Sequence, residues 1–241
     1  LPNFINCLDL FLAMLIGNYK TLLKTFIKQK YYFVDFSSID INKNSQVILR
    51  HDIDLDIDIA LEMAKIENNL NIKSTYFFLL KNDSYNLLSQ SSIDSVLKIK
   101  NLGHNISLHF DMKLYNDSKE GLKSELKIFN QTFGEKVNMI SIHRPSKDFL
   151  ENPNSYFAVN NSYEDKINKN ISYFADSGGS FKYGNPTNSE AFKNNKNIQL
   201  LIHPVWWINS DKSIKNTIDK VIDFKKNKLY KHFKKNISTL S

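Results

Sequence analysis

The sequence predicts a single α/β domain built around a parallel β-sheet or barrel. Short apolar, β-branched runs alternate with longer amphipathic segments through most of the chain, which is the pattern of strands joined by helices. The 241 residues, 41% of them hydrophobic, suffice for one sizeable core, and single α/β barrels commonly have this length. Ionisable residues also follow several predicted strands directly, at the ends where such folds bind ligands.

Apolar spacing defines the elements. Apolar runs predict strands at residues 31–36, 47–51, 74–80, 106–110, 137–143, 171–176 and 198–203. Apolar residues three and four apart predict helices at residues 11–30, 57–70, 92–102, 119–133 and 214–233. Residues 148–170 show neither spacing, so we predict no element there. We expect one domain over residues 1–241, with an N-terminal helix and strand (1–45), a barrel core that carries the motifs (46–205) and a C-terminal helix (206–241).

Composition limits the cellular compartment and the classes of binding partner that we expect for the protein. The net charge is +7, but dense lysine runs occur only near residues 225–235, and no nucleic-acid-binding motif accompanies them. We interpret this run as the solvated end of an amphipathic helix. Cys7 is the single cysteine, which excludes an intrachain disulfide and fits a reducing compartment. Residues 8–16 are apolar but too short to span a bilayer and lack a preceding basic segment, so we expect a cytoplasmic location without a transmembrane segment.

Residues 47–54, VILRHDID, form the stretch around which the chain is organised. An apolar run leads directly into Arg50, His51, Asp52 and Asp54. If the strand continues, Asp52 and Asp54 share a face, and two close carboxylates repel unless a cation such as a metal ion neutralises them. The alternative is a helix start, with one Asp as the N-cap and further acids in the first turn of the helix at 57–70.

Histidines also lie at the ends of several predicted strands. Four of the six lie at or near predicted strand ends: His51, His109, His143 and His203. A parallel barrel brings its strand ends together on one rim, so these side chains are expected to meet there, together with Asp176. His104 and His232 do not follow strands, and we interpret them as structural or surface residues. Tyr76, Phe77 and Phe78 are expected in the core.

Several of these stretches together resemble the polysaccharide deacetylase family, also described as the NodB-homology or carbohydrate esterase family 4 superfamily. They are VILRHDID (47–54), ALEMAKIENNLNIKSTYFF (60–78), GHNISLHFD (103–111), SIHRPS (141–146), YFADSGG (173–179) and LLIHP (200–204). They follow the family's order, and the likeness is greatest to the bacterial branch with an R-H-D-x-D motif. The resemblance implies a distorted (β/α) barrel that hydrolyses an acyl group, such as an N-acetyl group on a carbon–nitrogen bond, from a carbohydrate in surface-polysaccharide synthesis.

The resemblance also implies a metal centre. Asp52 matches the family's catalytic base, and Asp54 and His109 match metal ligands. Lys113 stands where the family has a second ligating histidine, so a different third ligand is needed. His143 is the first substitute and Asp111 the second. Such ligands suit a divalent metal, foremost Zn²⁺, with Fe²⁺, Co²⁺ or Ni²⁺ possible by ligand type.

Further roles follow from the same resemblance. Arg144 matches the arginine that orients the base, and His203 matches the general acid. His51, Asp176 and Trp206 are expected to line the substrate cleft, where Trp206 offers an aromatic wall for a sugar; packing at the barrel rim is the other interpretation of this tryptophan. Three other functions remain open: release of another group such as formyl, a binding protein that has lost the chemistry, as Lys113 suggests, and electrostatic nucleic-acid binding, which no motif supports.

Overall fold

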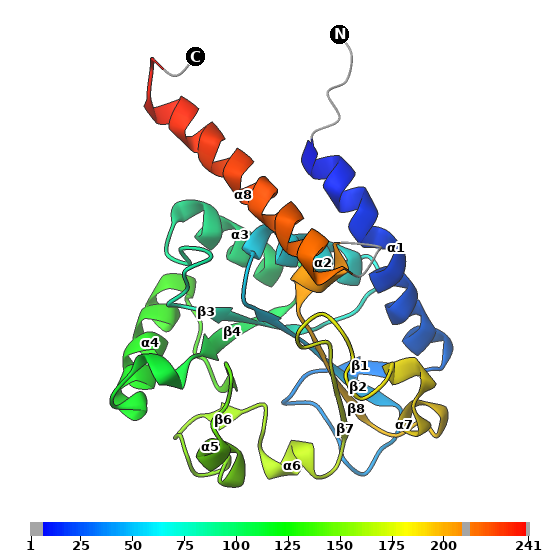
Figure 1. Ribbon diagram of the computed structural model, residues 1–241. Coiled ribbons are helices and arrows are strands. Elements are labelled where there is room, and N and C mark those ends of the chain that lie inside the picture. Colours follow the sequence, from blue (N-terminus) through cyan, green and yellow to red (C-terminus); the bar gives the residue numbers. More distant parts are fainter. Residues whose placement is uncertain (1–6, 209–212, 240–241) are drawn as a thin grey trace.

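The computed structural model describes residues 7–208 and 213–239, with side chains described from residue 18 onward. At its centre is a sheet of eight parallel strands in the order β6-β5-β4-β3-β2-β8-β7, with β1 beside the first half of β2 (Figure 1). The strands are β1 (Tyr32–Val34), β2 (Gln46–Ile53), β3 (Thr75–Leu79), β4 (Asn105–Phe110), β5 (Met139–Ile142), β6 (Asn160–Asn161), β7 (Ser172–Ala175) and β8 (Ile198–Ile202).

The sheet curls into a distorted barrel. The barrel is open because its edge strands β6 and β7 do not pair with each other within the described part of the chain. Parallel strands need crossover connections, which the helices supply. The α-helices are α1 (Cys7–Lys28), α2 (Ile57–Asn68), α3 (Gln90–Asn101), α4 (Ser118–Phe133), α5 (Lys147–Glu151), α6 (Asp165–Asn168), α7 (Glu190–Lys193) and α8 (Ile214–Asn236). Short 3₁₀ turns are η1 (Met112–Leu114), η2 (Pro186–Asn188) and η3 (Pro204–Trp207). The predicted α/β class is confirmed.

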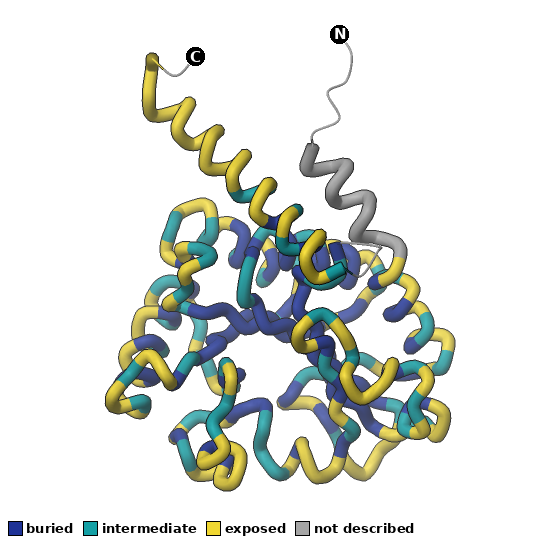
Figure 2. Tube along the Cα trace, in the orientation of Figure 1, coloured by how far each residue is buried: buried dark blue, intermediate teal, exposed yellow. Residues whose placement is uncertain are grey.

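Buried side chains pack on both faces of the sheet, whose central strands are buried along their length (Figure 2). On the outer face Leu49 of β2 packs in one cluster with Leu23 of α1 and Met63 of α2. On the inner face Ile48 and Phe77 belong to a smaller cluster inside the barrel. Each such side chain contributes about 1.5–3 kcal/mol through burial. The aromatic residues predicted for the core are fully buried, namely Tyr76, Phe77 and Phe78.

The predicted strands and long helices are present, with ends displaced by a few residues. The segment that showed no apolar spacing holds the short elements α5, β6 and α6. Side-chain hydrogen bonds fix them: Asn161 Nδ2 donates to the Pro153 carbonyl at 2.7 Å, and the Asp165 N–H donates to Asn154 Oδ1 at 2.9 Å. Elements of two to five residues are too short to show a period.

No helix within residues 7–208 and 213–239 has the length and apolar character needed to cross a bilayer. The apolar run at residues 8–16 falls in the part of α1 whose side chains lie outside the described residues.

Candidate active site

Strand β2 distributes its ionisable residues between two faces. Arg50 and Asp52 contact each other on the inner face, with Nη2 of the arginine 3.0 Å from Oδ2 of the carboxylate. His51, between them, points to the helix layer, where its Nε2 lies 2.7 Å from Oε1 of Glu67 in α2. The alternation is that of a strand which continues to Ile53. The N-cap of α2 is Asp56, so Asp52 and Asp54 are free of a capping role.

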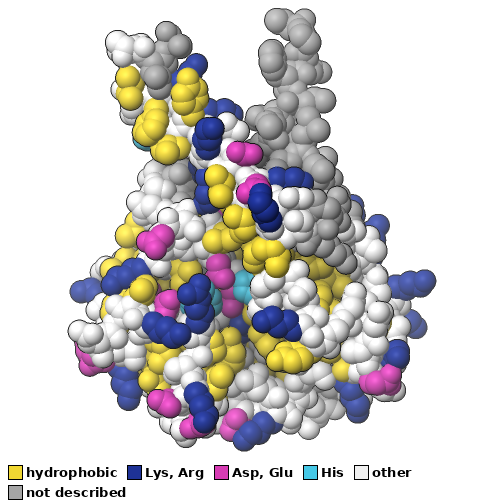
Figure 3. All heavy atoms as spheres, viewed as in Figure 1, with side chains coloured by type: hydrophobic (Ala, Val, Ile, Leu, Met, Phe, Trp, Pro, Cys, Tyr) yellow, Lys and Arg dark blue, Asp and Glu magenta, His cyan; other side chains and the backbone are white. Residues whose placement is uncertain are grey.

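Three side chains from different strand ends converge on one point. Asp54 follows β2, His109 lies in β4, and His143 follows β5. Nε2 of His109 is 3.1 Å from Nδ1 of His143, and each of these nitrogens is 3.4 Å from Oδ1 of Asp54. These three atoms are the group of possible metal ligands that the described residues present. Figure 3 shows acidic and histidine side chains together in a hollow near the middle of one face.

The geometry fits a small divalent cation. Four-coordinate zinc has bonds of about 2.0–2.1 Å to nitrogen and oxygen, which places neighbouring ligand atoms about 3.3–3.4 Å apart. Oδ1 of Asp54 is also buried with no hydrogen-bond partner among the described residues, so a bound cation would satisfy it. Although burial opposes ionisation, polar contacts with His109 and His143 at 3.4 Å and the charges of His109 and His203 hold the pKa of Asp54 far below its usual range.

The other candidate ligands lie elsewhere. Asp111 accepts a hydrogen bond from the Lys113 N–H at 3.0 Å and serves as the N-cap of η1. Lys113 itself is exposed. Of the two candidates for the third ligand, His143 lies beside Asp54 and His109, and Asp111 is not part of that group.

Asp52 is a buried carboxylate held in a fixed orientation. Its Oδ2 accepts hydrogen bonds from Arg50 and from Ser141 Oγ, both at 3.0 Å, and lies 3.8 Å from Nε2 of His109. Oδ1 has no partner among the described residues. Burial would raise the pKa of Asp52, but the charges of Arg50, His109 and His203 outweigh it and lower that pKa. Asp52 is thus ionised, with one oxygen ready to accept a proton.

The arginine that contacts Asp52 is Arg50, whereas Arg144 was expected beside it. Arg50 is fully buried, hydrogen-bonded to Ser162 and Asp52, and surrounded by the rings of Phe77, Tyr163 and Tyr173. Arg144 is exposed, and among the described residues no hydrogen bond or ion pair joins it to Asp52. Arg50 and Asp52 are two residues apart in β2, so their side chains lie on the same face of the strand. This spacing alone would have predicted the contact, whereas the family motif pointed to Arg144.

His203 and Asp176 form a second fixed pair. Nδ1 of His203 is 2.7 Å from Oδ1 of Asp176, which also accepts from the His203 backbone N–H at 2.9 Å. Nε2 points the other way and lies 3.8 Å from Oδ2 of Asp54. Burial alone would lower the pKa of His203, but the hydrogen bond and charge of Asp176, together with the charges of Asp52 and Asp54, raise it to about 9. The ring is therefore protonated at neutral pH.

The residues expected to line the substrate cleft divide into two groups. Asp176 and Trp206 line the cavity described below. Asp176 is only 3% exposed, and its oxygens are occupied by His203 and by Trp207 Nε1 at 2.7 Å, so it also positions His203. His51 has no exposed surface and pairs with Glu67 on the helix side of β2, which places it outside the cleft.

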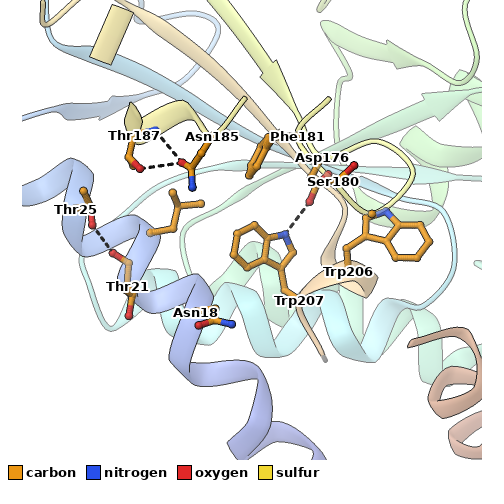
Figure 4. A pocket seen from close by; sticks show the side chains of 12 residues that line it. Asn18, Thr21, Thr25, Asp176, Ser180, Phe181, Asn185, Thr187, Trp206 and Trp207 are labelled. Atoms are coloured by element: carbon orange, nitrogen blue, oxygen red, sulfur yellow. Dashed lines mark hydrogen bonds between the residues drawn. The ribbon is translucent and has the colours of Figure 1, made fainter. Parts of the chain in front are cut away.

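A cavity of about 480 Å³ lies beside this pair, between α1, the loop after β7 and η3. Figure 4 shows Trp207 forming one wall, with its indole nitrogen on Asp176, while Trp206 lies on the other side of that carboxylate. Threonine and asparagine side chains of α1 and of the segment at η2 line the side of the cavity opposite Trp207. No lysine or arginine is among its described lining residues. Its size is that of pockets for small organic ligands.

No family model matches the sequence, and no curated protein does. Solved structures that superpose include a family 4 carbohydrate esterase from Bacillus anthracis, 18% identical, covering 88% of this chain and 87% of that chain with a TM-score of 0.45. Peptidoglycan deacetylase PdaC from Bacillus subtilis is 11% identical, with 83% and 100% covered and a TM-score of 0.46. Chitin deacetylase from the fungal pathogen Colletotrichum lindemuthianum is 14% identical, with 79% and 86% covered and a TM-score of 0.44. Superposition at this level of identity does not decide a function.

Proposed function

We propose that the protein is a metal-dependent hydrolase that removes an acyl group, N-acetyl in the simplest case, from a sugar of a glycan or glycan precursor. One observation carries the proposal: the donor atoms of Asp54, His109 and His143 meet at 3.1–3.4 Å between an oriented carboxylate, Asp52, and a protonated histidine, His203. A setting in bacterial surface-polysaccharide synthesis is part of the proposal and rests on the motif resemblance.

Asp54, His109 and His143 would hold the cation, and their two nitrogens and one oxygen favour Zn²⁺. A divalent cation at this point supplies positive charge that polarises an acyl carbonyl and lowers the pKa of water toward about 7.

The remaining steps belong to the protein's own groups. Oδ1 of Asp52 accepts a proton from the attacking water as the new carbon–oxygen bond forms. Nε2 of His203 donates its proton to the sugar nitrogen as the carbon–nitrogen bond breaks. The products are a carboxylic acid and a free amine, and the two residues exchange protons with solvent before the next turnover. Arg50 and Asp176 act through these two residues as positioning groups.

The cavity beside Trp207 supports an uncharged sugar ligand. Aromatic faces pack against the apolar faces of sugar rings, while hydroxyl and amide side chains such as Thr25 and Asn185 bind hydroxyl groups. A sugar diphosphate would need cationic side chains to compensate its charge, and the described lining offers none. We therefore expect this cavity, whose lining does not include Asp54, His109 or His143, to hold a neutral part of a glycan.

Elemental analysis of the purified protein, paired with acetate release from neutral N-acetylglucosamine oligomers and from UDP-N-acetylglucosamine, tests the proposal. We expect bound divalent metal, acetate release that a chelator abolishes and Zn²⁺ restores, and preference for the oligomers. Release of formate from N-formyl sugars in place of acetate would indicate a deformylase. Sugar binding with neither metal nor turnover would indicate an inactive relative and contradict the proposal.

A further inference from the structure

Helix α8 continues well beyond the surface on which it packs (Figures 1 and 2). Its first half is anchored by the buried Thr217 and Val221, and two lysines near the middle of the helix pair with acidic residues at the start of α2. Lys225 Nζ is 3.5 Å from Oδ2 of Asp56, and Lys228 Nζ is 2.7 Å from Oδ2 of Asp58. Every residue from 226 to 239 is exposed. A helix end without tertiary packing is only marginally stable in water, so an additional surface is needed to support it.

An apolar stripe begins at Ile222 and runs along the exposed half. Ile222, Leu229, Tyr230 and Phe233 are 56%, 53%, 51% and 43% exposed. At 3.6 residues per turn these four side chains fall within a sector of about 100°, on a different side of the helix from the anchoring residues. Figure 3 shows hydrophobic side chains gathered on this projecting end. The stripe is therefore not the face that holds α8 to the body of the protein.

Positive charge surrounds the stripe without compensation. No acidic residue follows Asp223 in the sequence. Among the described residues, no carboxylate forms an ion pair with Lys226, Lys231, Lys234 or Lys235. Lys231 and Lys235 are four residues apart on the helix, where like charges repel. A negatively charged partner would relieve this repulsion.

We propose that the projecting half of α8 binds an anionic lipid surface, lying in the plane of the membrane with its stripe among the acyl chains. Apolar residues on one side and lysines around them are what an interfacial helix needs. Lys226 lies within the stripe, and its long side chain extends to the headgroups while its methylene groups remain buried. Nucleic acid would satisfy the lysines but leave the stripe in water, and a second copy of the chain would bring the same unpaired lysines into contact.

Co-sedimentation of the intact protein with vesicles tests the proposal, and its outcome does not depend on the proposed enzyme activity. Vesicles of phosphatidylcholine with phosphatidylglycerol should bind at least about tenfold more tightly than phosphatidylcholine alone, and salt should weaken that binding. The variants Leu229→Ser/Phe233→Ser and Lys231→Glu/Lys235→Glu should each weaken it by about tenfold or more. The matched changes Ile128→Ser and Lys127→Glu on α4, both at exposed positions, should leave it unchanged.

Circular dichroism of each variant verifies that the body remains folded. Equal affinity for neutral and anionic vesicles, no binding to either, or equal loss in the α4 controls would overturn the proposal. So would a concentration-dependent dimer that the Leu229→Ser/Phe233→Ser variant abolishes in the absence of lipid, since a second copy would then cover the stripe.

Discussion

Carboxylates and histidines cluster on both sides of strand β2, and the two clusters differ in how their carboxylate oxygens are satisfied. On the outer face, Oε1 of Glu67 accepts from Tyr19 and lies 2.7 Å from His51, while Oε2 accepts from Ser74 at 2.5 Å and Tyr76 at 3.0 Å. On the inner face, Oδ1 of Asp52 and Oδ1 of Asp54 are buried with no hydrogen-bond partner among the described residues.

This difference indicates that the outer carboxylate stabilises the fold, whereas the inner carboxylates are available for binding or catalysis. A buried carboxylate with all its lone pairs occupied stabilises the fold, because removing any partner leaves an unpaired polar group. A buried carboxylate with an unoccupied oxygen at the centre of a ligand-like cluster is arranged to receive something, here a proton or a cation. Residue type alone does not distinguish the two groups, since each combines acids with histidines.

The largest expected effect is on the inner face. Asp52→Asn removes the proton acceptor while keeping its shape, so kcat/KM should fall about 10²–10⁴-fold. Bound metal should remain, because Asp52 is not among the three clustered donors. Steady-state acetate release and metal content measured on the same preparation check both statements. Turnover within a few-fold of the parent would remove Asp52 from the reaction.

Replacing Arg50 and Arg144 in turn compares a buried arginine that contacts Asp52 with an exposed one that does not. Arg50→Met leaves the Asp52 carboxylate buried without its main cation, so the free energy of unfolding should fall by about 3–5 kcal/mol. Arg144→Met, at an exposed position, should change it by about 0.5 kcal/mol or less. Urea denaturation of both variants measures this difference. The reverse order would return the orienting role to Arg144.

The outer group should respond in stability alone. Glu67→Gln removes a charge that faces His51 and disturbs the hydrogen bonds from Tyr19 and Tyr76, so the free energy of unfolding should fall by about 1–3 kcal/mol. Metal content and turnover per folded molecule should match the parent. Metal loss in folded Glu67→Gln protein would mean that the two faces are not separate in function.

The smallest effect is a displacement of the pH profile. His203 donates only while protonated, so kcat/KM should decline as pH rises through its pKa of about 9. Asp176→Asn removes a charge that raises this pKa, so the basic limb should move to lower pH. A purely structural role of Asp176 would lower the rate at every pH without moving the limb.

The regular elements were predictable because their apolar periods are long enough to recognise, as in α2 and β8. The segment at 148–170 was not, because its short elements depend on individual side-chain hydrogen bonds, such as that from Asn161 to the Pro153 carbonyl. The convergence of Asp54, His109 and His143 followed from one rule, the meeting of parallel strand ends.

The direction in which individual side chains point was harder to predict from the spacing of residues in the sequence. Placing His51 in the cleft disregarded the alternation that joined Asp52 to Asp54, since the same alternation turns His51 to the helices. Asp176 was placed at the correct strand end, but its hydrogen bonds to His203 and Trp207 depend on the path of the loop after β7, which the sequence does not encode in any simple period.

The central claim is that Asp54, His109 and His143 form a metal site, and it is tested most directly by metal content after Zn²⁺ saturation and gel filtration. His143→Ala should lose bound zinc, as should His109→Ala and Asp54→Ala, because each change removes one of the three donors. Asp111→Ala, which removes a carboxylate two residues from His109, should retain zinc at the parent level. Full zinc retention in His143→Ala together with loss in Asp111→Ala would contradict the site described here.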